Sequence, residues 1–211
     1  RDEPYRRALT GLYARIAATA RALDHLEPMR HAVGEAPPYG RAAEFAADLE
    51  TIHESLVAHG SALLARGRLR RLRRALGVFG FHLAAVDLRQ NSEVHERVVA
   101  ELFAVARPGI DYRALDEASR VRLLVEELET PRPLASPFAG YSEETGSELE
   151  ILRAAAEMHA RYGASSVPNY IISKCEGASD VLEVALLARE AGLYRPAGGT
   201  LELDIIPLFE T

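Results

Sequence analysis

Two short apolar stretches of the sequence end in charged side chains whose types and spacing could support chemistry. The segment VDLRQ, residues 86–90, contains Asp87 and Arg89, and the closing segment PLFET contains Glu210. Residues two apart on a strand share a face, so Asp87 and Arg89 are expected to point the same way. The planar guanidinium of Arg89 matches carboxylate and phosphate oxygens, which makes it a candidate anion-binding group. The carboxylate of Glu210 is a hard oxygen ligand of the kind that Mg²⁺ takes.

Each of these residues also has a purely structural interpretation. Arg89 could form a salt bridge with a neighbouring helix, and the residues alone favour neither alternative. For Glu210 the residues alone favour a helix N-cap partner or a carboxylate at the rim of the fold. Lys174 ends another apolar stretch and could contact a substrate, although a lysine in such a position is more often solvated.

The histidines and the cysteine are weaker candidates. His82 and His95 could each act as a general base. We expect His82 to lie inside a strand as a core histidine and His95 to lie on the following helix, so catalysis is assigned to neither. Cys175 is the single cysteine and has no histidine near it in sequence. It can form no internal disulfide, and we expect no nucleophilic role for it.

Helices and strands are expected to alternate in a way that positions the charged groups. Apolar residues recur at helical spacing in most of the chain, and three short apolar runs are typical of buried parallel strands. Helices are expected over residues 4–23, from Phe45 to near Gly60, over 66–77, from a cap at Ser92 through Val105, over 116–129, from Ser142 through His159, and from a cap at Ser179 to Gly192. Strands are expected over residues 78–90, 167–174 and 204–210, and a loop over 27–40. This alternation predicts parallel βα units, which place their chemistry at the carboxyl ends of the strands.

Composition excludes several classes of protein. The chain has 211 residues, of which 48% are hydrophobic and 27% charged, and its net charge is −6. An acidic chain is a poor partner for nucleic acid or anionic lipid. Six arginines in residues 66–77 could form a phosphate-binding patch, but a solvated helix with Leu69, Leu72 and Leu76 facing the core is favoured. No apolar run is long enough for a membrane helix, and a cytoplasmic location is the default expectation.

Three segments in order resemble the phosphoenolpyruvate carboxylase family of the bacterial type. They are GFHLAAVDLRQNSEVH at 80–95, YIISK with SDVLEVALLAREAGL within 170–193, and IIPLFET at 205–211. The resemblance covers about the last two thirds of the chain, and the N-terminal helices are less distinctive. Three ordered motifs are far more specific than one.

The resemblance implies a fold, a reaction and roles for two residues. The family joins phosphoenolpyruvate to bicarbonate and releases oxaloacetate and phosphate, an anaplerotic carbon fixation that feeds the tricarboxylic acid cycle. It uses magnesium or manganese and no biotin, and its usual form is a homotetramer whose subunits contain a (β/α)8 barrel with extra helices. In this sequence, the resemblance implies that Arg89 binds the anionic groups of the substrate and that Glu210 is one of two acidic metal ligands.

Departures from the family pattern are of two kinds. Leu88, Asn91, Lys174 and Cys175 replace other residues in ways that we expect to be tolerated. The larger departure is that the family's catalytic histidine, second metal aspartate, catalytic lysine and glycine-rich loop have no counterpart in this chain. Together with the absence of an initiator Met, this leads us to expect an internal fragment that holds no catalytic residue and is inactive alone.

The resulting fold prediction is a helix-rich α/β chain with about three parallel strands of a (β/α)8 barrel. We expect an N-terminal helical segment over residues 1–76 and a partial barrel over residues 77–211. Two alternatives stay open at this point. One is another Mg-dependent barrel enzyme that acts on phosphoenolpyruvate or pyruvate, and the other is a helical scaffold domain without catalysis.

Overall fold

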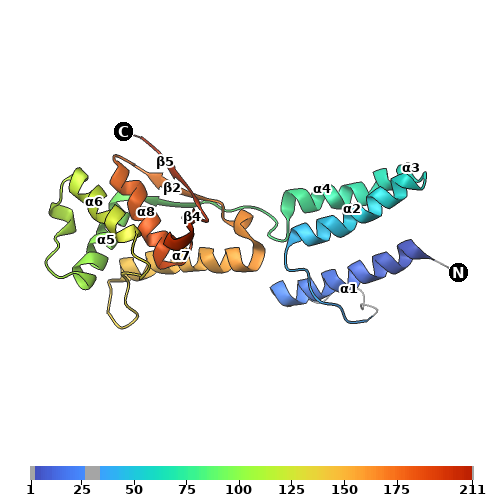
Figure 1. Ribbon diagram of the computed structural model, residues 1–211, viewed down its shortest axis with the longest axis horizontal. Coiled ribbons are helices and arrows are strands. Elements are labelled where there is room, and N and C mark those ends of the chain that lie inside the picture. Colours follow the sequence, from blue (N-terminus) through green and yellow to red (C-terminus); the bar gives the residue numbers. More distant parts are fainter. Residues whose placement is uncertain (1–2, 27–33, 211) are drawn as a thin grey trace. The chain divides into compact units, whose positions relative to one another are not determined.

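The computed structural model describes residues 3–26 and 34–210, and the chain divides into two compact units (Figure 1). The first unit is Arg1–Ala84 and the second is Ala85–Thr211. Part of the predicted loop, residues 27–33, lies outside the described residues. The boundary expected after residue 76 falls within a helix of the first unit. No helix in the described ranges is both long and apolar enough to span a bilayer.

The first unit is helical, as its sequence pattern predicts. Its elements are α1 (Pro4–Asp24), α2 (Ala42–Ala58), α3 (Ala62–Leu64), the π-helical turn η1 (Ala65–Leu69) and α4 (Arg70–Phe79). Pro4 occupies the first helical position, where the missing N–H has no intrahelical partner to lose. Tyr39, Phe45, Leu49 and Leu76 form the buried core of this unit.

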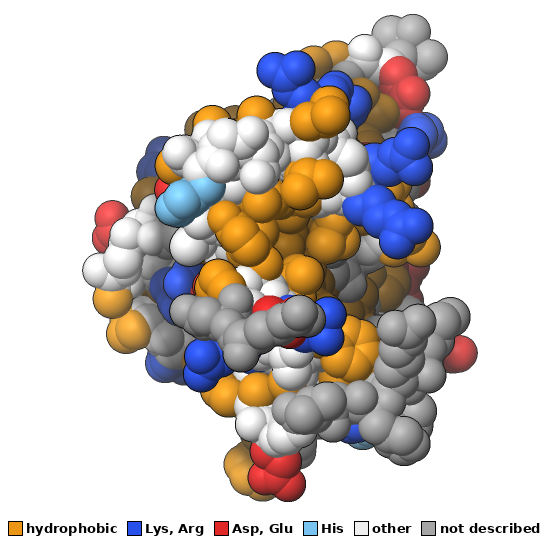
Figure 2. Space-filling model, turned by 90° about the vertical axis from the view of Figure 1, so that its right-hand side faces the viewer, with side chains coloured by type: hydrophobic (Ala, Val, Ile, Leu, Met, Phe, Trp, Pro, Cys, Tyr) orange, Lys and Arg blue, Asp and Glu red, His pale blue; other side chains and the backbone are white. Residues whose placement is uncertain are grey.

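The arginine-rich segment forms a solvated helix, but it is not continuous. Gly67 has non-helical backbone angles and interrupts the helix before α4. Leu69 and Leu76 pack on the core as expected, whereas Leu72 is 45% exposed, which corrects the prediction that it faces the core. Figure 2 shows hydrophobic side chains gathered on one face of the molecule, with basic side chains at its edge. Within this unit, Leu72 lines an apolar groove of about 490 Å³ together with Leu9 and Leu64.

The strand predicted over residues 78–90 is wrong for residues 78–87, because the observed strand begins only at Leu88. Helix α4 continues through Phe79, where the N–H of Gly80 bonds to the carbonyl of Leu76, and the chain then turns. His82 therefore lies in a turn and not within a strand. Val78 and Phe79 complete the helix, and residues 80–84 form the turn. The prediction failed because an apolar run this short does not distinguish helix from strand by periodicity.

The second unit contains the predicted parallel sheet. Its strands are β1 (Leu88–Asn91), β2 (Asn169–Ser173) and β5 (Asp204–Pro207), paired in the order β1-β2-β5 with both pairs parallel. Its helices are α5 (Ser92–Ala106), η2 (Tyr112–Ala114), α6 (Glu117–Leu128), α7 (Glu143–Tyr162), η3 (Ala164–Ser166) and α8 (Ala178–Glu190). A small antiparallel pair, β3 (Tyr194–Arg195) and β4 (Thr200–Leu201), encloses η4 (Pro196–Gly198) and was not predicted. The predicted helix-rich α/β fold with three parallel strands is confirmed.

Helices cover one face of this sheet. Tyr170 and Ile172 of β2 are 2% and 0% exposed and belong to a core shared with α5, α6, α7 and α8. On the opposite face, which we call the open face, Arg89, Ile171 and Ile206 lie side by side in register. Arg89 and Ile206 are exposed, so the strands predicted to be buried are buried on one face only in this chain. Strands that are adjacent in chain order and have helices on a single face fit part of a βα barrel.

Two helix caps differ from the sequence prediction. Asn91, and not Ser92, caps α5, because its side chain accepts from the N–H of Glu93 at 3.0 Å. Gly177, and not Ser179, precedes the first turn of α8. Ser142 caps α7 as predicted. Because neither serine caps its helix, the Ser92 and Ser179 hydroxyls bond instead to the Lys174 carbonyl and the Glu117 carboxylate.

A buried ion-pair network joins α6 to α8 and to the segment that follows α6. Arg189 donates to the carboxylates of Glu127 at 3.2 Å and Glu190 at 2.9 Å, and it also bonds the backbone carbonyl of Glu127. Arg107 donates to the other oxygen of the Glu127 carboxylate. Glu190 accepts from the backbone N–H of Leu134 at 3.0 Å. Each buried charged group in this network has more than one hydrogen-bond partner, which offsets the cost of removing it from water.

Replacing Arg189 with alanine is expected to lower the free energy of unfolding by about 3 kcal/mol, because it leaves the buried Glu127 carboxylate short of a partner. Arg97→Ala is the matched control, since Arg97 also pairs with a glutamate, Glu144, but its side chain is 41% exposed. Exposed pairs contribute little, so the control should lose much less stability. Urea unfolding followed by circular dichroism measures both. Equal losses would contradict the importance of burial.

Candidate functional site

Arg89, Ser173 and Glu210 meet at the carboxyl end of the parallel sheet. The Nε of Arg89 donates to the Oγ of Ser173 at 2.8 Å. The Nη2 of Arg89 lies 3.6 Å from the Oε1 of Glu210. The side chains of Arg89 and Glu210 are 58% and 49% exposed, so solvent reaches both charges. The two site residues predicted from the sequence are therefore neighbours.

The register of the strands explains this meeting. Arg89 pairs with Ile171, and Asn91 at the end of β1 pairs with Ser173 at the end of β2. Beyond β5, the N–H of Leu208 bonds the carbonyl of Ile172 at 2.9 Å, and the N–H of Cys175 bonds the carbonyl of Leu208 at 3.0 Å. These bonds carry the closing segment past the end of β5 along β2. Glu210 is thus delivered to the same edge as Arg89.

The electrostatics of this edge suit ligand binding better than structural pairing. The partner of Arg89 is Glu210, at the end of a strand, and not a neighbouring helix. A half-exposed ion pair at 3.6 Å contributes little to stability, so Arg89 and Glu210 can each exchange this contact for a ligand at little cost. The guanidinium keeps free N–H donors for an anion, and the carboxylate keeps oxygens for a cation. In the described ranges, no group of three or more His, Cys, Asp or Glu side chains could hold a metal ion by itself.

Asp87 and Ser173 illustrate what the sequence pattern missed. Asp87 accepts a hydrogen bond from the side chain of Asn169 at 2.9 Å, at the other end of the strands, and does not join the site. Ser173 was not predicted as a site residue. In the sequence, Ser173 is recognisable only as the last residue of a strand, on the same face as Ile171. Serine is too common at strand ends for this to identify a site residue.

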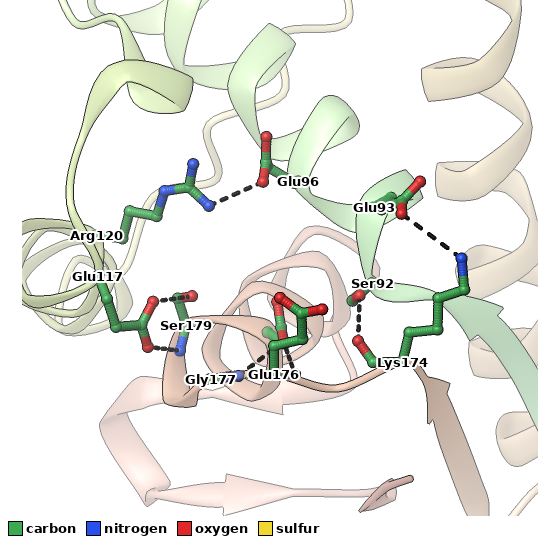
Figure 3. A pocket seen from close by; sticks show the side chains of 10 residues that line it. Ser92, Glu93, Glu96, Glu117, Arg120, Lys174, Glu176, Gly177 and Ser179 are labelled. Carbon is green, nitrogen blue, oxygen red and sulfur yellow. Dashed lines mark hydrogen bonds and ion pairs between the residues drawn. The ribbon is translucent and has the colours of Figure 1, made fainter. Parts of the chain in front are cut away.

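A polar cavity of about 320 Å³ lies beside this edge, at the N-terminal ends of α5, α6 and α8 (Figure 3). Lys174 and Arg120 contribute its positive charges, and each faces a carboxylate. The Nζ of Lys174 lies 3.7 Å from Glu93, and the Nη1 of Arg120 lies 2.9 Å from Glu96. Lys174 therefore lines a cavity at the rim, where its side chain is 57% exposed.

The loop after β2 is held in place by side chains from three helices. Asp180 accepts hydrogen bonds from the backbone N–H groups of Glu176 at 2.7 Å and Gly177 at 3.1 Å. The Oγ of Ser92 donates to the carbonyl of Lys174 at 2.7 Å. Lys174 has a φ of 54°, a left-handed conformation that non-glycine residues seldom adopt. These bonds fix the chain immediately after Ser173.

Glu117 completes this arrangement from α6. Its carboxylate accepts from the N–H of Ser179 at 3.0 Å and from the Ser179 hydroxyl at 2.6 Å, which lowers the pKa of Glu117. The carboxylate approaches so closely that a Cβ on Gly177 would lie 2.6 Å from it. A side chain at this position would have to displace the end of the Glu117 side chain, whereas the backbone, with a φ of −144°, places no demand for glycine.

Two titratable groups are buried beneath this cavity. His95 lies on α5, as predicted, is 0% exposed, and bonds through Nε2 to the Tyr170 hydroxyl at 2.9 Å. Burial lowers the pKa of His95 to about 4, against an opposing effect of Asp180. Burial raises the pKa of Glu183 to about 8, although Tyr112 donates a hydrogen bond to it at 2.7 Å. Both groups are uncharged near neutral pH.

The cysteine is also buried. Cys175 is 4% exposed, and burial together with the nearby Asp180 raises the pKa of its thiol. A thiol that stays protonated is a poor nucleophile, which agrees with the expectation that Cys175 plays no nucleophilic role.

The Glu183 carboxyl makes stability depend on pH in a defined direction. Between pH values near 4.5 and 8 the unfolded carboxyl is ionised and the folded one is protonated, so stability falls as pH rises. Glu183→Gln should remove a loss on the order of 5 kcal/mol across this window. His95 acts oppositely, since its unfolded form takes up a proton as pH falls from 6.5 towards 4.

Urea unfolding of the wild type and of Glu183→Gln at several pH values measures this effect. Tyr112→Phe is the companion variant, because removal of its hydrogen bond raises the pKa of the folded Glu183 carboxyl further and should extend the dependence to higher pH. Parallel stability profiles for the wild type and Glu183→Gln would contradict a protonated Glu183.

Comparison with known proteins extends the resemblance to the whole chain. The family model described as phosphoenolpyruvate carboxylase matches residues 1–211. Phosphoenolpyruvate carboxylase of Aromatoleum aromaticum is 65% identical over 210 residues, which are 100% of this chain and 23% of that protein. The enzymes so named from Azoarcus sp. and Rhodopseudomonas palustris are 60% and 54% identical and are covered to 23% and 22%. The chain spans less than a quarter of the length of these curated relatives. The match includes the N-terminal helices, and the chain belongs to the phosphoenolpyruvate carboxylase family.

Proposed function

We propose that this chain is a central part of a protein that carboxylates phosphoenolpyruvate with bicarbonate to give oxaloacetate and phosphate. The observation that carries the proposal is the convergence of Arg89 and Glu210 at one edge of the sheet in a chain of this family. An arginine beside a carboxylate suits a phosphorylated carboxylic acid that is bound together with a metal ion. The reaction supplies oxaloacetate to the tricarboxylic acid cycle.

Arg89 binds the anionic groups of phosphoenolpyruvate in this proposal. Its Nε is occupied by Ser173, which leaves the two terminal nitrogens for phosphate or carboxylate oxygens. Its guanidinium is exposed enough to be reached by a small molecule and is fixed at one end by the strand. Positive charge at this place stabilises negative charge that develops on the phosphoryl group or the enolate.

Glu210 supplies one ligand for Mg²⁺ or Mn²⁺, and a second carboxylate from outside this chain completes the protein ligands. Glu210 suits this role because it is exposed and only weakly paired with Arg89. A bound cation would replace Arg89 as the positive partner of its carboxylate. Magnesium commonly binds one or two carboxylates and fills its other positions with water and substrate oxygens. When bound, it neutralises charge on the transferring phosphoryl group, and no biotin takes part.

The missing strands of the parent protein close the sheet into a (β/α)8 barrel. The open face, with Arg89, Ile171 and Ile206, becomes the interior of that barrel. The family resemblance supports a parent that is a cytoplasmic homotetramer acting on small molecules, without binding nucleic acid or membrane. The 211-residue chain alone is inactive, because it supplies one substrate arginine and one metal ligand but no catalytic residue.

Kinetics of the full-length protein test this proposal. Arg89→Ala should lower kcat/KM for phosphoenolpyruvate by about 100-fold, since a charge-assisted contact to the substrate is lost. Arg97→Ala is the control, because Arg97 is a comparably exposed arginine whose partner is Glu144. An unchanged kcat/KM with reduced stability in Arg89→Ala would instead support a structural scaffold. Oxaloacetate formed by the 211-residue chain, measured in a coupled assay, would contradict its inactivity.

A further inference from the structure

We propose that Ser173 is a positioning residue that holds the guanidinium of Arg89 in the orientation that receives the anionic substrate. The inference rests on the proposed function, because it takes Arg89 to be the group that binds phosphoenolpyruvate. The observation behind it is the hydrogen bond from the Nε of Arg89 to the Oγ of Ser173 at 2.8 Å. Ser173 itself acts through Arg89.

A bond to Nε constrains a guanidinium more usefully than a bond to a terminal nitrogen. The five N–H groups of the guanidinium lie in one plane, so a fixed Nε–H restricts the directions of the others. Both terminal nitrogens stay available for bidentate contact with carboxylate or phosphate oxygens. The Arg89 side chain is 58% exposed, and without the Ser173 bond it would be free to rotate. It would then lose that rotational freedom on binding substrate, which would lower the affinity.

Ser173, and not Glu210, is the group that sets this orientation. The contact of Arg89 with Ser173 is within hydrogen-bonding distance, whereas the contact with Glu210 is 3.6 Å long. The carboxylate of Glu210 lies beyond the end of β5 and is half exposed, so its own position is less constrained. The serine hydroxyl is the firmer of the two contacts.

The backbone of Ser173 is held rigidly. It ends the middle strand of the sheet and pairs with Asn91 of β1 on one side. On the other side, the carbonyl of Ile172 and the N–H of Cys175 both bond to Leu208. The carbonyl of the next residue, Lys174, accepts from Ser92 at 2.7 Å. A hydroxyl on so constrained a backbone is a fixed acceptor, as precise positioning requires.

Steady-state kinetics of the full-length protein with phosphoenolpyruvate and Mg²⁺ test this role. Ser173→Ala should raise KM for phosphoenolpyruvate by about three- to tenfold, with a smaller change in kcat, because one hydrogen bond that orients the binding group is lost. Ser173→Thr keeps the hydroxyl on a residue that strands tolerate well, so it should restore KM to within about twofold of the wild type.

A double-mutant cycle shows whether Ser173 acts through Arg89. In the Arg89→Ala background the serine has no guanidinium to orient, so Ser173→Ala should raise KM no further. Ser142→Ala is the matched control, because the Ser142 hydroxyl also bonds a charged group, Glu101, at 2.6 Å, but it caps α7 and its partners lie in α5 and α7. Its KM should equal that of the wild type.

The outcomes separate this inference from the proposed function. An unchanged KM in Ser173→Ala, together with a raised KM in Arg89→Ala, overturns the role of Ser173 and leaves the function standing. A full Ser173 effect that persists in the Arg89→Ala background also overturns it, since the serine would then act independently of Arg89. An unchanged KM in Arg89→Ala overturns the proposed function itself.

Discussion

Parallel pairing of β2 with both of its neighbours is the constraint on which the rest of the second unit depends. Tyr170 and Ile172 anchor this strand in the helical core, where they are 2% and 0% exposed. A slip by one residue would turn Tyr170 and Ile172 out of the helical core and bury Asn169 and Ser173 in their place, so the register is strongly specified. Because Tyr170 and Ile172 face the helices, Ile171 and Ser173 must face the other way. The register then places Arg89 beside them.

The same register explains why charged groups collect where they do. Parallel strands all present their carboxyl ends at one edge, and β1, β2 and the segment after β5 there contribute Arg89, Ser173 and Glu210. The helices that follow β1 and β2 begin at this edge, and carboxylates from α6 and α8 hold the loop after β2. Burial keeps His95 of α5 and Glu183 of α8 uncharged near neutral pH, so neither adds a charge to this edge. Backbone pairing of the strands therefore determines which residues meet at this edge, and side-chain contacts then hold them in place.

Most helices, the three parallel strands and two of the site residues could be predicted from the sequence. Apolar periodicity located the long helices and the three parallel strands, and strand ends led directly to Arg89 and Glu210. Periodicity failed over residues 78–87, where the chain completes α4 at Phe79, turns, and reaches β1 only at Leu88. It placed the caps of α5 and α8 too late, at Ser92 and Ser179, because the helices begin after Asn91, which accepts from the N–H of Glu93, and after Gly177, whose N–H bonds to Asp180. Ser173 and Asn169 could not be found, since their importance comes from partners about 80 residues away in the chain.

The central claim is that the open face of the sheet is the interior of a closed barrel in the full-length protein. Thiol labelling of Ile206→Cys tests it most directly, because Ile206 lies on that face and is 38% exposed, whereas the native Cys175 is buried. The labelled peptide is quantified by mass spectrometry in the 211-residue chain and in the full-length protein. The account predicts rapid labelling in the chain alone and strong protection in the full-length protein. Equally rapid labelling in both would contradict it.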